Sequence, residues 1–171
     1  MNQIRRIVTG HSKDGKSIIA SDTYLNAISI SPGKNFIQLW ADDEIPLHPN
    51  NGKMEDNLEW FPKPGGHRFF VWVVPPKSEI SSQSVTKEEL NALLPGFAEK
   101  FEPNNPGMHT TDSVDCSYVI SGAIILELDD EVEIELKEKD SVIQNGTRHR
   151  WHNRGTIPAV LITTSIGSKR R

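Results

Sequence analysis

Hydrophobic positions along this chain alternate with polar ones in short runs, and Gly, Pro, Asn and Asp separate the runs. Alternation of apolar and polar side chains over about four to eight residues is typical of β-strands with one buried face. The pattern predicts strands over 3–9, 17–21, 36–40, 67–74, 115–128, 131–136, 140–144, 149–153 and 159–166. Many short strands at regular spacing indicate an all-β sandwich or barrel.

Three of these ranges carry a more specific expectation. The first two flank Lys13-Asp14-Gly15-Lys16, whose Asp-Gly pair suits a tight turn, so they are expected to form a hairpin. The range 67–74 is strongly apolar and stops at Pro75-Pro76, which predicts a central strand. The range 131–136 alternates Glu with Val, Ile and Leu, and this predicts a half-buried strand with its glutamates outward.

One short helix is predicted near 87–94. Thr86 is suited to cap its start, and Glu89 stands three residues later, as a capping box requires. Val85 and Leu90 have the spacing of a hydrophobic staple. The helix is expected to end near Pro95-Gly96, because Pro cannot donate a backbone hydrogen bond and Gly can turn the chain.

The segment 41–66 is polar, is rich in Asn, Pro and Gly, and predicts no element of its own. Irregular segments of this length in a small domain are usually functional loops or unstructured insertions. Two interpretations therefore remain open, a lid or binding loop over a site and an exposed insertion without function.

Length, charge and cysteine content exclude several classes of protein. With 171 residues, 1–171 is expected to be a single domain, with 1–75 contributing amino-terminal strands and a loop. The net charge is −4 and the basic residues are scattered, which argues against nucleic-acid binding. The apolar stretch 118–126 is shorter than the roughly 20 residues that span a bilayer, so no membrane role is expected. A single cysteine and an amino-terminus unlike a signal peptide favour a cytoplasmic location.

Two segments, 107–122 and 140–153, concentrate the residues that carry chemistry. If the first is extended, the side chains of His109, Thr111 and Asp115 share one strand face, because side chains repeat every two residues. In the second, His149 and Trp151 share a face and His152 points the other way. His149 is therefore expected to join His109 and Asp115 in one cavity.

These two segments resemble the two sequence motifs of the cupin superfamily. In the first segment His109, Asp115 and Gly122 fall on the leading His, the acidic residue and the closing Gly of the motif, and in the second segment Gly146, His149 and Asn153 fall on its Gly, His and Asn. Residues 109–115 also match the His-x-Thr-Asp-x-Val-Asp signature of a subgroup of stand-alone cupins. The resemblance implies a small jelly-roll barrel with these motifs in 107–166. It also implies a homodimer, in which the amino-terminal strands extend a sheet or exchange between subunits.

The departures from the motifs bear on the metal site that many cupins have. Thr111 stands where the first motif has its second His, Asp115 replaces Glu, and Lys139 takes the place of a Gly. What remains is His109, Asp115 and His149, a set of two imidazoles and one carboxylate that suits Fe, Zn, Mn or Ni. The alternative, equally open from the sequence, is a metal-free pocket in which these groups form hydrogen bonds or move protons.

Four further residues are candidate ligand-binding groups: Arg68, Thr111, Tyr118 and Trp151. Arg68 heads a strand and could clamp a carboxylate or enolate, although an ordinary surface arginine is the competing interpretation. The resemblance favours an enzyme acting on a small carbonyl- or carboxylate-bearing molecule, of the isomerase, dehydratase, decarboxylase or dioxygenase type. The alternative is a non-catalytic binding or sensing module with a metal-free pocket.

Overall fold

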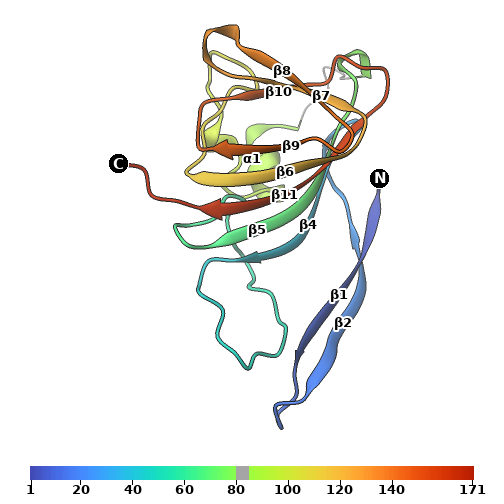
Figure 1. Cartoon of the computed structure of the whole chain (residues 1–171), viewed down its shortest axis with the longest axis vertical. Helices are drawn as coiled ribbons and strands as arrows, with labels where there is room; N and C mark the ends of the chain where they lie inside the picture. The colour runs from blue at the N-terminus through green and yellow to red at the C-terminus, as the bar shows by residue number, and fades with distance from the viewer. Residues whose placement is uncertain (80–84) are drawn as a thin grey trace.

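Two antiparallel sheets face each other, and a two-stranded hairpin projects from them (Figure 1). The computed structural model describes residues 1–79 and 85–171. The hairpin consists of β1 (Gln3–His11) and β2 (Ser17–Asn26). The larger sheet has the order β3 (Ile28–Ser31), β4 (Lys34–Asp42), β5 (His67–Val74), β11 (Ala159–Gly167), β6 (Ser113–Ser121) and β9 (Ser141–Asn145). The smaller sheet has the order β10 (Arg150–His152), β7 (Ala123–Glu127) and β8 (Glu133–Lys137).

Most of the predicted strands are confirmed. The hairpin turns at Ser12–Lys16 with Gly15 at φ +75°, and β5 lies centrally, between β4 and β11. The strand β3 was not predicted. It pairs with β4 across a two-residue turn, Pro32-Gly33, because Pro fixes φ at the first turn position and Gly adopts the positive φ needed at the second.

The predicted single strand 115–128 is wrong, because it divides at Gly122 into β6 and β7, which belong to different sheets. Gly122 has φ +78°, and a Cβ there would lie 2.6 Å from the carbonyl oxygen of Pro158. Only a residue without a side chain fits this corner.

The strand predicted over 131–136 is present as β8, but the prediction that it is half-buried is wrong. Val132 and Ile134 are 57% and 56% exposed, and only Leu136 joins the core. The reason is that β8 is an edge strand of the small sheet, and its first residues lie outside the core cluster.

The predicted helix is confirmed as α1 (Lys87–Leu93). The Oγ1 of Thr86 accepts a hydrogen bond from the Glu89 amide, and the Glu89 carboxylate accepts one from the Thr86 amide, so the capping box is complete. Val85 and Leu90 pack against the core. Three short 3₁₀ turns, Lys77–Glu79, Ala98–Lys100 and Asp129–Glu131, complete the described helical residues. No helix in the described ranges is long and apolar enough to cross a membrane.

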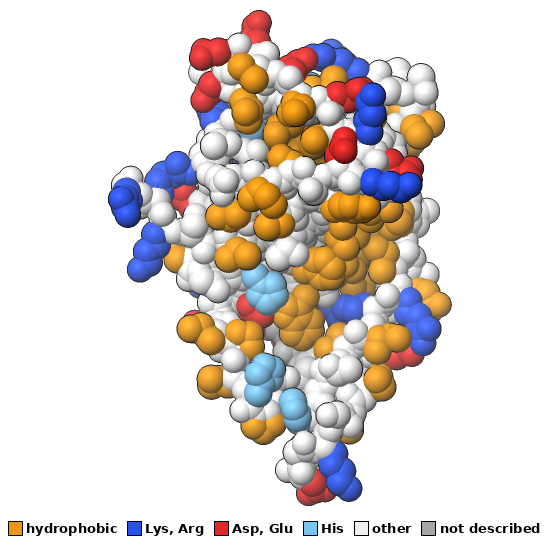
Figure 2. Space-filling model, in the orientation of Figure 1, with side chains coloured by type: hydrophobic (Ala, Val, Ile, Leu, Met, Phe, Trp, Pro, Cys, Tyr) orange, Lys and Arg blue, Asp and Glu red, His pale blue; other side chains and the backbone are white. Residues whose placement is uncertain are grey.

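Apolar side chains pack on both faces of the larger sheet. Between the sheets lies an aromatic-rich core that includes Phe36, Trp60 and Phe97. On the outer face, a second cluster around Ile37 and Val71 is covered by residues at the base of the hairpin. The rest of that face, over β11, β6 and β9, stays open, and Figure 2 shows apolar side chains gathered across the middle of this view.

Candidate functional site

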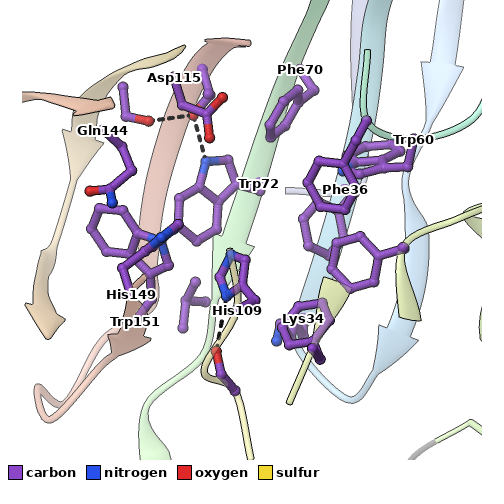
Figure 3. A pocket seen from close by; sticks show the side chains of 17 residues that line it. Lys34, Phe36, Trp60, Phe70, Trp72, His109, Asp115, Gln144, His149 and Trp151 are labelled. Atoms are coloured by element: carbon purple, nitrogen blue, oxygen red, sulfur yellow. Dashed lines mark hydrogen bonds between the residues drawn. The ribbon is translucent and has the colours of Figure 1, made fainter. Parts of the chain in front are cut away.

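A cavity of about 110 Å³ opens between the two sheets. A single water needs roughly 10–15 Å³ of such space, so the cavity admits a small organic molecule. Its walls are mainly aromatic, and its polar groups come from elements far apart in the chain (Figure 3). The groups that bear on its chemistry are Lys34, His109, Asp115, Gln144 and His149.

His109 and His149 form the centre of this pocket. Each donates its backbone N–H to the carbonyl of the other, at 2.9 Å. Residues paired in this way have their side chains on the same face, and the two ring centroids lie 4.2 Å apart. Phe101, which also lines the pocket, stacks on the His109 ring with the centroids 4.6 Å apart. The predicted meeting of the two histidines in one cavity is confirmed.

Both imidazoles present the same nitrogen atom for chemistry. Nδ1 of His109 lies 3.0 Å from the Gly107 carbonyl oxygen, and Nδ1 of His149 lies 2.9 Å from that of Thr147. A carbonyl only accepts hydrogen bonds, so each Nδ1 carries the proton and each Nε2 of the neutral ring keeps a lone pair.

Burial keeps these rings neutral. Desolvation, with His149 and Lys34 as neighbouring charges, lowers the pKa of His109 to about 4. Desolvation also lowers the pKa of His149, although the Asp115 carboxylate works in the opposite direction. The pocket therefore holds two neutral imidazoles side by side at neutral pH.

Asp115 lies on β6, at the other end of the pocket from Lys34 (Figure 3). Its carboxylate accepts a hydrogen bond from the Ser165 hydroxyl. Burial raises the pKa of Asp115, while the hydrogen bonds from Ser165 and Ser113 oppose that rise. The pocket thus combines a carboxyl group shifted toward its neutral form with two imidazoles that resist protonation.

The proposed metal trio fits a metal ion only in part. Two Nε2 lone pairs suit a first-row divalent metal. However, the donor atoms of His109, Asp115 and His149 do not all come within 4.8 Å of one another among the described residues. The Asp115 carboxylate would have to move toward the two rings to complete a three-donor site. As they are placed here, these residues do not fit a three-ligand metal centre.

Arg68 does not reach the pocket, so its predicted role as a ligand clamp is wrong. Its side chain is fully buried. The guanidinium donates to the carbonyl oxygens of Asp42, Glu59 and His67 at 2.7–3.0 Å, and it forms an ion pair with Asp43 at 2.8 Å. Every short contact of Arg68 is therefore internal, and its role is to fasten the segment 41–66 to β5.

The predicted ligand-binding roles of Thr111 and Tyr118 are also wrong. Thr111 is buried outside the pocket, where its hydroxyl accepts a hydrogen bond from Ser113. The chain bends at Asp112, so the two-residue alternation assumed from His109 to Asp115 is interrupted. Tyr118 is 43% exposed and lies on the outer face of β6. Neither residue lines the cavity.

Trp151 lies in the pocket as predicted, where its ring meets the ring of Trp72 at 5.4 Å, edge to face. The end of the segment 41–66 supplies Trp60 and Phe61 to the opposite wall. Because Trp60 is 5% exposed and Arg68 fastens this segment, the end of the predicted lid is a fixed wall of the pocket.

Sequence reasoning missed Lys34 and Gln144. Lys34 shares a strand face with Phe36, and a lysine on an apolar face is a signal the sequence already contains. Gln144 pairs in register with Asp115 across β6 and β9. Its side-chain amide donates to the Thr147 carbonyl at 3.1 Å, so it braces the turn that carries His149.

A second group of potential metal ligands lies outside the barrel. Glu127, Glu133 and His152 are, within the described ranges, the one set of three such side chains whose donor atoms cluster. Glu127 and Glu133 are already engaged by Arg150 and Arg154, respectively. Two guanidinium groups balance the two carboxylates, so this cluster is an ion-pair network. His152 points away from the pocket, as predicted.

Residues 99–165 match the Cupin_2 family, described as a cupin domain. This segment is a cupin domain. It contains both histidines of the pocket, Asp115 and Trp151. The prediction of an all-β cupin barrel with an amino-terminal strand extension and one short helix is confirmed.

Two curated relatives come from Diaporthe leptostromiformis, the Phomopsin biosynthesis cluster proteins C' and D. Each is 45% identical to this chain over 47 residues. The match covers 28% of this chain and 25% of each relative, so the chain spans a quarter of their length.

Solved structures that match this chain include several proteins described as cupins. The Schizosaccharomyces pombe Cnp3 cupin domain has a TM-score of 0.49 and 12% identity, covering 98% of this chain and 89% of that one. A putative ethanolamine utilization protein Q from Salmonella typhimurium has a TM-score of 0.46 and 7% identity, covering 99% and 100%. A Cupin 2 conserved barrel protein from Salinispora arenicola has a TM-score of 0.43 and 13% identity, covering 81% and 80%.

Proposed function

We propose that the cupin pocket binds a small carbonyl- or carboxylate-bearing molecule and transfers a proton on it. The observation that carries this proposal is the pair of neutral imidazoles, His109 and His149, each with a bare Nε2 in an aromatic cavity. A neutral imidazole in a water-poor pocket is a suitable general base for removing a proton next to a carbonyl.

His149 is the better base of the two. The nearby Asp115 carboxylate favours the charged form of His149. The neighbouring charges of His109, from His149 and Lys34, instead disfavour its charged form. His149 would therefore accept the proton, while His109 stays neutral and directs its Nε2 toward a donor on the ligand.

Asp115 completes an acid–base arrangement. Burial raises the pKa of Asp115 and lowers that of His149. The Asp115 carboxylate that supports a proton on His149 can itself take up a proton more easily than an exposed aspartate, and it can then donate that proton or a hydrogen bond to the carbonyl oxygen of the ligand. Isomerisation, dehydration and decarboxylation all need this type of proton transfer.

The experiment is hydrogen–deuterium exchange in D₂O on a panel of small 2-oxo and 3-oxo acids, followed by NMR. We expect exchange next to the carbonyl of at least one acid to be accelerated, and His149→Gln to reduce the acceleration by about 100-fold or more. His152→Gln is the matched control, because His152 lies outside the barrel three residues away. Exchange at the uncatalysed rate with every acid would overturn the enzyme proposal and favour a non-catalytic binding module.

We also propose that two copies of the chain pair through the open part of the larger sheet. Its exposed side chains include Tyr118, Ile120, Ile143 and Ile166, which are 39–55% exposed. The outward positions of β6, β9 and β11 carry no charged residue. The neighbouring part of the same face is already covered by the hairpin of this chain. A second copy is the occupant we propose, because the same uncharged apolar face on both copies can pair with itself.

A further inference from the structure

Lys34 is the first residue of β4, directly after the Pro32-Gly33 turn. The alternation of β4 places its side chain on the same face as Phe36, inside the aromatic pocket. Figure 3 shows Lys34 at one end of the pocket beside His109, with Asp115 at the far end and Trp72 between them. The Lys34 amine, a cation when protonated, therefore lies at one end of an otherwise largely apolar cavity.

The ammonium group has no acidic partner among the described residues. Burial lowers the pKa of Lys34, and no carboxylate opposes this effect. The charge of Lys34 disfavours the charged form of His109. Burial without a counter-charge favours the uncharged amine, and an anion that enters the pocket supplies the missing counter-charge, so that Lys34 keeps its proton at a lower cost when the anion is bound.

We infer that Lys34 is the specificity-determining residue of the pocket and pairs with a carboxylate of the ligand. The ligand class is then a monoanionic carboxylate on a small, flat, apolar body. The flat body fits against the aromatic walls that Phe36, Trp60 and Trp72 provide. This inference rests on the proposed function, which makes this pocket the ligand site. It adds which end of the pocket holds the carboxylate of the ligand.

The placement also gives the ligand a direction. With its carboxylate at Lys34, the body of the ligand passes the two imidazoles and points toward Asp115. A reacting carbon next to a carbonyl then lies in the middle of the pocket, close to His149. The carboxylate acts in binding, and the proton transfer takes place on a different part of the molecule.

The experiment uses benzoate and benzamide, which have nearly the same shape and differ in charge. Each is titrated into ¹⁵N-labelled protein and followed on the indole N–H signals by NMR. Trp60, Trp72 and Trp151 line the pocket, whereas Trp40 lies in a separate groove by the hairpin and serves as an internal control. The variants are Lys34→Met and, as a control for the loss of one positive charge, Lys13→Met in the exposed turn.

We expect wild type and Lys13→Met to bind benzoate at least tenfold more tightly than benzamide. We expect Lys34→Met to abolish this preference without changing benzamide affinity. Equal affinity for the two probes, an unchanged preference in Lys34→Met, or no shift of the pocket indoles would each overturn the inference. The exchange experiment on oxo acids reports separately on proton transfer, so a Lys34-dependent benzoate site without exchange would overturn only the catalytic proposal.

Discussion

His109 and His149 exchange both of their backbone hydrogen bonds with each other, and this pairing brings their ring centroids to 4.2 Å. The distance between the rings is therefore fixed by the main chain. A proton on one ring raises the cost of charging the other, because like charges in a poorly solvated site repel. Both rings resist protonation, and a proton on one makes protonation of the other more costly still.

Stability should fall as the pH is lowered toward 4. The pKa of His109 is about 4 in the folded protein and about 6.5 when unfolded, so the unfolded chain binds more protons between these values. We expect His109 alone to lower the free energy of unfolding by roughly 3 kcal/mol from pH 7 to pH 4. His149 acts in the same direction, whereas Asp115, whose folded pKa is raised, acts in the opposite one.

Urea unfolding of wild type and His109→Gln at several pH values measures this contribution. The variant should show a shallower loss of stability between pH 7 and pH 4 than wild type. Parallel curves for the two proteins would mean that His109 titrates normally in the folded state.

Removing the Arg68 guanidinium should destabilise the whole domain. Arg68→Met leaves the buried Asp43 carboxylate, which is 5% exposed, without its guanidinium partner, and leaves backbone carbonyls of the segment 41–66 without donors. Breaking a buried ion pair in this way costs about 3–5 kcal/mol of unfolding free energy. Urea denaturation tests this value, and the double variant Arg68→Met/Asp43→Asn should recover part of it. A cost below about 1 kcal/mol would contradict the structural role of Arg68.

Metal content should be low. Protein purified without chelator should hold iron, zinc, manganese or nickel far below one ion per chain, because Asp115 does not join the two histidines as a third donor. Elemental analysis with His149→Ala as control makes this measurement. Near-stoichiometric metal that disappears in the variant would establish the His109–Asp115–His149 centre instead.

The oligomeric state tests the open sheet face. Light scattering should give a mass near twice 19.2 kDa for wild type. Ile143→Glu and Tyr118→Glu should each yield monomers, because each places a charge on the proposed contact. Ile134→Glu, on an equally exposed apolar residue of the small sheet, should remain dimeric. A monomeric wild type would refute the pairing.

The sequence predicts the local elements of this fold well, and it predicts less of how they meet. Strand alternation and the capping box of Thr86 and Glu89 are local signals, and both are confirmed. The corner at Gly122 escaped prediction, because the alternation continues on both sides while the chain changes sheet. Ile134 is exposed because no other element covers its face of the small sheet in the described residues, and the alternation of residues along one strand cannot predict that.

The residues of the candidate site were likewise predicted where the signal is local and missed where it depends on tertiary packing. His109, Asp115, His149 and Trp151 were found because motif spacing and strand alternation report which side chains share a face. Thr111 was misplaced, since the bend at Asp112 interrupts that alternation. Arg68 and Lys34 depend on tertiary packing. The side chain of Arg68 forms only internal contacts that hold the segment 41–66 in place. Lys34 lines the pocket because β4 and the segments that carry the histidines face the same interior of the barrel.

The groups that line this pocket come from near the beginning of the chain, at Lys34, to near its end, at Thr163. A molecule bound there joins strands that are remote from one another in the sequence, and it has no equivalent site in the unfolded chain. Its binding free energy therefore adds to the cooperative stability of the entire barrel. Chemical libraries can be screened on this protein by melting temperature alone, before any reaction is known.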